Sequence, residues 1–90
     1  MKEVKITADV HASWGETPPR YRVYVDHDLM TERDFIYPGS EIYITEHILV
    51  RLKPGGHFIR VEQVNGDNIK VKNITVDGEL IDTHEFVVTE

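Results

Sequence analysis

The chain has 90 residues, of which 40% are hydrophobic and 29% are charged, a composition typical of one folded domain rather than a disordered chain. Its 10 basic and 16 acidic residues give a net charge of −6, which argues against nucleic acid or an anionic membrane as a partner. The absence of cysteine excludes a disulfide scaffold and a cysteine-based zinc site. We expect a single domain over residues 1–90.

The N-terminal segment predicts where the protein is made. Residues 1–4, Met-Lys-Glu-Val, lead into no apolar stretch with a cleavage site, and no apolar run reaches the length of a membrane span. We therefore expect cytoplasmic synthesis without a signal peptide and no membrane partner. A virion is one destination that fits, and an extracellular location fits only a domain excised from a longer protein.

The first part of the chain alternates apolar and polar residues, which is the pattern of strands that bury one face. The pattern predicts a strand over residues 4–11, a break with Gly and Pro at 14–19, and a strand over 21–25. The turn 26–28, Asp-His-Asp, follows, and residues 29–36 form a shorter and less regular strand.

The middle of the chain continues in the same way. Residues 37–40, Tyr-Pro-Gly-Ser, end the preceding strand, and a strand over 42–52 keeps one inward parity. Residues 53–56, Lys-Pro-Gly-Gly, are expected to form a loop, because glycine permits positive φ. Another strand is predicted over 57–64.

The last third contains a change of strand parity. The tight turn 65–67, Asn-Gly-Asp, precedes a strand in which the inward parity shifts by one residue near Lys72 and Asn73. This shift predicts a β-bulge there or a bend between two sheets. The stretches 80–82 and 85–88 complete a set of about eight short strands with no helical pattern. We therefore predict an all-β fold, an antiparallel β-sandwich of jelly-roll type.

Three segments together resemble a known family. Residues 18–26, PPRYRVYVD, are similar to a proline-preceded strand that ends at an Asp-containing turn, and residues 50–61, VRLKPGGHFIRV, to a step from strand through Gly and His to Ile-x-Val. Residues 59–78 resemble a closing segment in which an Asn-containing loop precedes a strand running to Val-Asp-Gly. The family is that of the calcium-dependent, xylan-binding carbohydrate-binding modules, which are small jelly-roll sandwiches. The likeness covers roughly residues 4–82, and the ligand loop is shorter here because only Gly66 separates Asn65 from Asp67.

The resemblance implies a calcium site and a glycan site. It places Asp67 and Asn68 where the metal ligands of the family stand, and Asp26 is a further carboxylate that can supply the oxygen ligands that Ca²⁺ prefers. The alternative is that Asn and Asp occupy these turns because they tolerate a left-handed backbone and hydrogen-bond to it. Both interpretations stay open.

Sugar recognition usually pairs an aromatic face with side chains that hydrogen-bond to hydroxyl groups. Trp14, in its Gly- and Pro-bounded loop, is the expected platform, and Tyr24 and Tyr43 lie at positions opposite the core-facing parity. Asn65 is the expected hydrogen-bonding partner. The alternative for Trp14 is that it folds back over the open end of the sandwich, and exposed aromatic residues would equally suit a protein interface.

No pattern of catalytic residues is present in the sequence. The five histidines lack metal-ligand spacing, the serines lack a nucleophile-elbow setting, and a small sandwich without long loops offers little cleft for paired carboxylates. We expect a non-enzymatic binding module of the carbohydrate-binding kind. The alternative is an accessory or structural protein of a virion, such as a tailed-bacteriophage head or tail, that acts through protein contacts.

Overall fold

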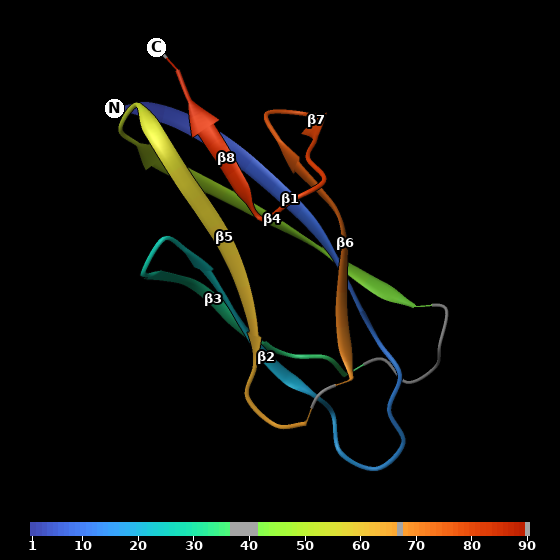
Figure 1. Cartoon of the computed structure of the whole chain (residues 1–90). Coiled ribbons are helices and arrows are strands. Elements are labelled where there is room, and N and C mark those ends of the chain that lie inside the picture. Colours follow the sequence, from blue (N-terminus) through green and yellow to red (C-terminus); the bar gives the residue numbers. More distant parts are fainter. Residues whose placement is uncertain (37–41, 67, 90) are drawn as a thin grey trace.

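The computed structural model describes residues 1–36, 42–66 and 68–89 of the protein. In these ranges eight strands form two antiparallel four-stranded sheets and no helix occurs (Figure 1), which confirms the predicted all-β class, the sandwich and the number of strands. The strands are β1 (Lys2–Ala12), β2 (Arg20–Val25), β3 (Asp28–Asp34), β4 (Tyr43–Leu52), β5 (Gly55–Gln63), β6 (Ile69–Val76), β7 (Glu79–Leu80) and β8 (Glu85–Val88). The first sheet has the order β4-β1-β6-β7 and the second the order β3-β2-β5-β8.

The core lies between the two sheets because their central strands alternate strictly. Every second residue of β1, from Val4 to Ala12, is buried, and so is every second residue of β2, from Tyr21 to Val25. Successive side chains of a strand point to opposite faces, so each strand turns one apolar row inward and one polar row outward. The buried apolar residues are Val4, Ile6, Ala8, Val10, Ala12, Tyr21, Val23, Val25, Phe35, Ile48, Leu52, Ile59, Ile74, Phe86 and Val88.

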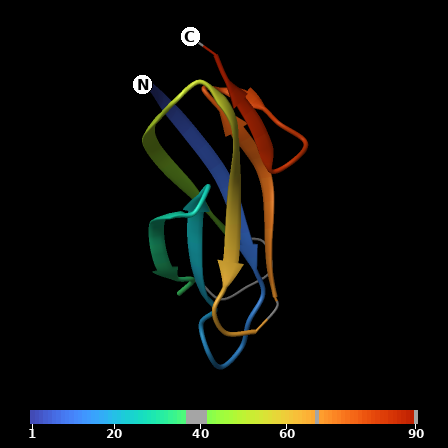
Figure 2. The same cartoon turned by 60° about the vertical axis from the view of Figure 1, so that its left-hand side comes forward.

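The molecule is elongated, with extents of 46 × 22 × 18 Å, and its two ends differ. Both termini lie at one end, where Lys2 Nζ donates a hydrogen bond to Thr89 O at 3.3 Å (Figures 1 and 2). The loop between β1 and β2 and the described part of the loop between β5 and β6 lie together at the other end. We call this second end the loop end.

The parity shift predicted near Lys72 and Asn73 is a β-bulge, and β6 stays in one sheet. Opposite β1, Thr7 pairs with Thr75 but Asp9 pairs with Lys72, so Ala8 faces two residues of β6. Asn73 takes a positive φ of 54° within the bulge. The bulge lets residues on both sides of it bury their apolar side chains against the same core.

Two details differ from the prediction. Gly55 and Gly56, expected in a loop, begin β5 and pair with Val88 and Val87 of β8. A second register shift, which the alternation did not indicate, lies between Val23 and Tyr24 of β2, where β3 carries one extra residue.

None of the described residues belongs to a helix with the length and apolarity needed to cross a membrane.

Candidate functional site

Asn65 and Asn68, two predicted ligand residues, hold the loop end together. Asn65 Oδ1 accepts a hydrogen bond from Arg20 N at 2.6 Å, and Asn65 Nδ2 donates to Pro18 O at 3.3 Å. Asn68 Nδ2 donates to Ser13 O at 2.6 Å, and Asn68 Oδ1 accepts from Gln63 Nε2 at 2.6 Å. Both amides therefore tie the β5–β6 loop to the β1–β2 loop, and their hydrogen-bonding groups are already engaged.

Trp14, the predicted sugar platform, lies in the β1–β2 loop. Its side chain is half-buried and packs against the hydrophobic core. Part of the indole surface is therefore buried against the core.

The two predicted tyrosines lie on opposite outer faces of the sandwich. Tyr24 belongs to β2 of the second sheet, and its ring lies 4.3 Å from the guanidinium carbon of Arg60. Tyr43 belongs to β4 of the first sheet, and its ring stacks on that of His11 with centroids 4.9 Å apart. Tyr24 and Tyr43 do not form one aromatic face, because alternate residues of two facing sheets point away from each other.

A shallow hollow lies beside the His11–Tyr43 stack. It has a volume of about 230 Å³ and we call it the loop-end hollow. Its lining residues are His11, Ala12, Ser13, Asn68, Lys70 and Lys72. His11 faces Tyr43 on one side and Lys70 on the other in the sheet register, so an aromatic ring, an amide and two ammonium groups surround this part of the surface.

Asp26, a predicted calcium ligand, has a different set of partners. Asp26 Oδ2 lies 2.7 Å from His57 Nδ1, and Asp26 Oδ1 accepts a hydrogen bond from Phe58 N at 3.1 Å. His57 Nε2 lies 2.7 Å from Lys53 O. Burial acts to raise the pKa of Asp26, but the hydrogen bonds from His57 and from the Phe58 amide outweigh it and lower that pKa. Hydrogen bonds to Asp26 and to Lys53 O raise the pKa of His57.

The two predicted calcium ligands that the structure describes, Asp26 and Asn68, are not brought together. Asp26 follows the last residue of β2, whereas Asn68 bonds to Gln63, which pairs with Tyr21 near the start of β2. A strand of this length spans about 17 Å. Asp26 and Asn68 therefore cannot ligate the same ion. Asp67 lies outside the described residues. Among the residues that the structure does describe, no cluster of three or more His, Asp or Glu side chains is arranged to hold a metal.

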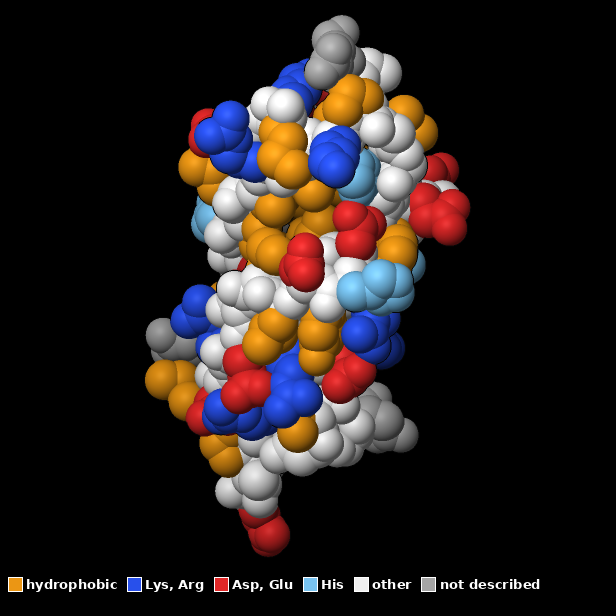
Figure 3. Space-filling view, turned by 90° about the vertical axis from the view of Figure 1, so that its left-hand side faces the viewer, with side chains coloured by type: hydrophobic (Ala, Val, Ile, Leu, Met, Phe, Trp, Pro, Cys, Tyr) orange, Lys and Arg blue, Asp and Glu red, His pale blue; other side chains and the backbone are white. Residues whose placement is uncertain are grey.

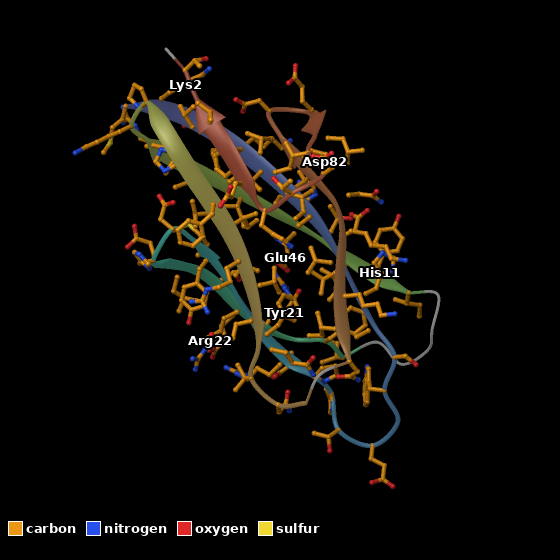
Figure 4. All side chains as sticks on the ribbon, in the orientation of Figure 1. Lys2, His11, Tyr21, Arg22, Glu46 and Asp82 are labelled. Carbon is orange, nitrogen blue, oxygen red and sulfur yellow. The ribbon has the colours of Figure 1, made fainter. Side chains whose placement is uncertain are left out.

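A buried ionic cluster that the sequence analysis missed lies between the sheets. Glu46 of β4 is only 3% exposed, and its Oε1 accepts hydrogen bonds from Tyr21 Oη at 2.8 Å and from Arg33 Nε at 2.6 Å. Figure 4 shows Tyr21 and Glu46 in the interior of the sandwich. The sequence did indicate a buried carboxylate here, because position 46 has the inward parity of Ile44 and Ile48 and yet is a glutamate. The cluster joins β2, β3 and β4 across the side of the sandwich.

In the described part of the chain, β4 is an edge strand, and no strand pairs with its outer side. Lys5 N donates to Asp77 Oδ1 at 2.9 Å and Asp77 N donates to Lys5 O at 2.7 Å, so the backbone groups of Lys5 point toward β6. Consecutive residues of a strand point these groups to alternate sides, so those of Ile6 point toward β4, where Ile48 is its partner. The even-numbered residues of β4 therefore bond to β1, and the odd-numbered residues point outward. We call Tyr43, Thr45, His47, Leu49 and Arg51 the free-edge residues.

The other described edges are short or protected. β7 has two residues and β8 has four, while β3 contains the bulge and carries Glu32 and Asp34. In contrast, β4 pairs with β1 over ten residues without a register shift and contains no proline or lysine. Bulges, short length, proline and lysine are the usual means of protecting an edge, and β4 uses none of them. The surface that Figure 3 shows mixes hydrophobic, cationic and anionic side chains without a broad patch of one charge.

Comparison of the chain with protein-family models, with curated proteins and with solved structures found no match.

Proposed function

We propose that this domain is a non-enzymatic binding module that takes up an extended segment of a partner protein at the β4 edge, as an accessory protein of a larger assembly such as a virion. The observation that carries the proposal is the row of five free-edge residues, whose outward N–H and C=O groups pair with no strand among the described residues. Such a row accepts a further strand through main-chain hydrogen bonds, while side chains at alternate positions select the partner.

The buried charges support a structural rather than a catalytic role. Glu46 and Tyr21 bond to each other and Glu46 to Arg33, so this buried carboxylate and phenol are paired within the fold. Burial is the main reason that the pKa of Tyr21 is raised, and its hydrogen bond to Glu46 adds to the effect. A neutral phenol held on a buried carboxylate stabilises the side of the sandwich next to β4.

Selection from a library of random linear peptides on the immobilised domain tests this proposal. We expect the selected peptides to alternate in polarity with a period of two, because they bind as strands. His47→Pro should abolish their binding, since it removes an outward N–H that β1 does not use and edge strands tolerate proline. His47→Ala, which keeps that N–H, is the matched control. Peptides that bind both variants equally well would contradict strand addition at β4.

Glycan binding at the loop-end hollow is the second candidate. The observation in its favour is the placement of Tyr43, which is 52% exposed, on His11 beside the lysines and the amide that line the hollow. Screening of neutral and acidic glycans should then yield a ligand whose affinity falls in Lys70→Ala and not in Lys53→Ala, which changes an exposed lysine outside the hollow. We prefer Lys70 to Trp14 for this test because Trp14 also packs on the core.

Calcium binding by Asp67 would be part of this second candidate function. Thermal unfolding in millimolar calcium and in EDTA decides the point, because an ion that binds the native state raises the midpoint of unfolding. A midpoint that is higher in calcium, and that loses this dependence in Asp67→Asn, would support a metal at the β5–β6 loop. Equal midpoints would remove calcium from the candidate.

A further inference from the structure

We propose that the segment which pairs with β4 is the β4 strand of a second copy of the chain, antiparallel and with His47 opposite His47. This inference rests on the proposed function, since it names the partner of the same edge. The result is a two-fold symmetric dimer in which the two first sheets form one continuous sheet.

The positions of the unpaired backbone groups select this alignment. In an antiparallel pair, two opposed residues exchange two hydrogen bonds when the backbone groups of both point toward the partner strand. With His47 at the two-fold axis, Tyr43 faces Arg51 and Thr45 faces Leu49 of the second copy. All five free-edge residues of both chains are then paired. A shift of the alignment by two residues in either direction leaves at least one of them without a partner in the opposite strand.

The side chains on the outer face agree with the same alignment. Tyr43 and Leu49 are 52% and 65% exposed, so both side chains are available to a partner. Opposed residues of two strands lie about 5 Å apart, so the guanidinium of Arg51 reaches the ring of Tyr43 of the second copy. The fold already uses such a contact between Arg60 and Tyr24.

Charge also allows a second copy to approach at this edge. The chain carries a net charge of −6, yet none of the free-edge residues is acidic. The one carboxylate of β4, that of Glu46, points inward and accepts hydrogen bonds from Arg33 and Tyr21. Two β4 strands therefore meet without opposed carboxylates.

The symmetry of the pairing closes the assembly at two copies. An antiparallel pair of identical strands is isologous, so each β4 edge is used up by the other. The remaining described edges are the short β7 and β8 and the bulged β3, which do not offer a second row of the same kind. We therefore expect a dimer and not a fibre.

Analytical ultracentrifugation of the whole chain, together with amide hydrogen exchange, tests the dimer. We expect a concentration-dependent dimer in which the amides of the free-edge residues exchange more slowly as the protein concentration rises. His47→Pro should be monomeric and His47→Ala should still dimerise. A dimer whose free-edge amides exchange as fast as in the monomer would overturn the proposal.

A pair of substitutions at Tyr43 tests the alignment without proline. Tyr43→Lys places an ammonium group opposite Arg51 of the second copy, and Tyr43→Glu places a carboxylate there. Both variants lose the ring, and we expect Tyr43→Lys to dimerise about tenfold more weakly than Tyr43→Glu, from two symmetry-related cross-strand pairs. Net charge alone predicts the opposite order, because the Lys variant is the less negative. Equal dissociation constants, or the opposite order, would overturn the alignment.

A peptide with the sequence of residues 42–52 separates failure of this inference from failure of strand addition. If the chain stays monomeric while the peptide slows exchange at the free-edge amides, the self-pairing is overturned and the edge remains a strand acceptor. If the chain is monomeric and the peptide has no effect at millimolar concentration, both proposals are overturned. Slow exchange of these amides in a dimer, with competition by the peptide, supports both.

Discussion

Asp26 and His57 stabilise each other in their charged forms. The pKa of His57 is raised by its hydrogen bonds to Asp26 and Lys53 O, and that of Asp26 is lowered because the bonds it accepts from His57 and the Phe58 amide outweigh the effect of burial. The His57 contribution is complete below the unfolded-state histidine pKa of about 6.5 and disappears as the pH rises through the higher folded-state value. The Asp26 contribution is complete above about 3.9 and disappears as the pH falls through the lower folded-state value.

We therefore predict that the free energy of unfolding decreases as the pH rises from about 6.5. His57→Gln should remove this dependence, and His84→Gln, which replaces an exposed histidine, should keep it. Urea denaturation at a series of pH values measures both. A wild-type stability that increases over this range would contradict the interpretation of the pair.

Glu46 is a charged residue on the otherwise apolar inner face of β4. Its carboxylate is almost fully buried, whereas the side chain of Arg33 is 49% exposed and brings its charge in from the surface. Removal of Arg33 leaves the buried carboxylate with the Tyr21 hydroxyl as its one partner among the described residues. We predict that Arg33→Met destabilises the fold by about 2 kcal/mol, less than for a fully buried pair because half of the Arg33 side chain is exposed to solvent. Lys72→Met, at an exposed position, should change stability by less than about 0.5 kcal/mol in the same urea titration.

At the scale of the elements, the bulge in β6 depends on one backbone conformation. Asn73 has a φ of 54°, and its side-chain amide donates to Asp9 Oδ2 at 3.0 Å. Asn tolerates this left-handed region, and a β-branched residue does not. We predict that Asn73→Val lowers the free energy of unfolding by about 2 kcal/mol, while Asn73→Gly, which relieves φ but loses the hydrogen bond, changes it by about 1 kcal/mol or less. Equal losses in the two variants would mean that the amide, and not the backbone, determines the bulge.

The same element shows what can be predicted from sequence. The bulge was predictable because the strands bury one face, so a parity shift of one residue requires an extra residue in the ladder. The strand start at Gly55 was not, because glycine carries no side chain to alternate and its partner β8 lies more than thirty residues away. The second bulge, in β3, was hidden by a strand whose residues are mostly polar on both faces.

The candidate site was harder to predict than the fold because its geometry depends on pairing between distant strands. Asn65 was expected in a tight turn, but it lies in the loop that leads from β5 in one sheet to β6 in the other. Its bonds to Arg20 and Pro18 follow from the register of β2 against β5. The same register places Asp26 beside His57 and away from Asn68. The local sequence indicates which residues lie in loops. The distances between possible ligands depend on how distant strands pair, which the local sequence does not show.

At the scale of the whole molecule, the proposed dimer has a definite shape. β4 runs along the long axis from the loop end toward the end that holds the termini (Figure 1). An antiparallel pair of β4 strands therefore directs the two loop ends in opposite directions. A dimer of this shape can bridge two partners at its far ends, with the two loop-end hollows far apart on the same outer face of the continuous sheet.

The net charge of the chain predicts how this dimer responds to salt. Two copies that each carry −6 repel one another, and the proposed contact forms through backbone hydrogen bonds and apolar side chains rather than through ion pairs. Salt shortens the range of that repulsion, from about 10 Å at 0.1 M to about 3 Å at 1 M. We therefore expect the dissociation constant measured by sedimentation equilibrium to fall as sodium chloride is raised. Glu16→Lys, in the β1–β2 loop, makes each copy less negative by two units and should strengthen the dimer at low salt but not at high salt. A dimer that weakens as salt is added would instead depend on ion pairs, and β4 self-pairing as argued from its free-edge residues would be wrong.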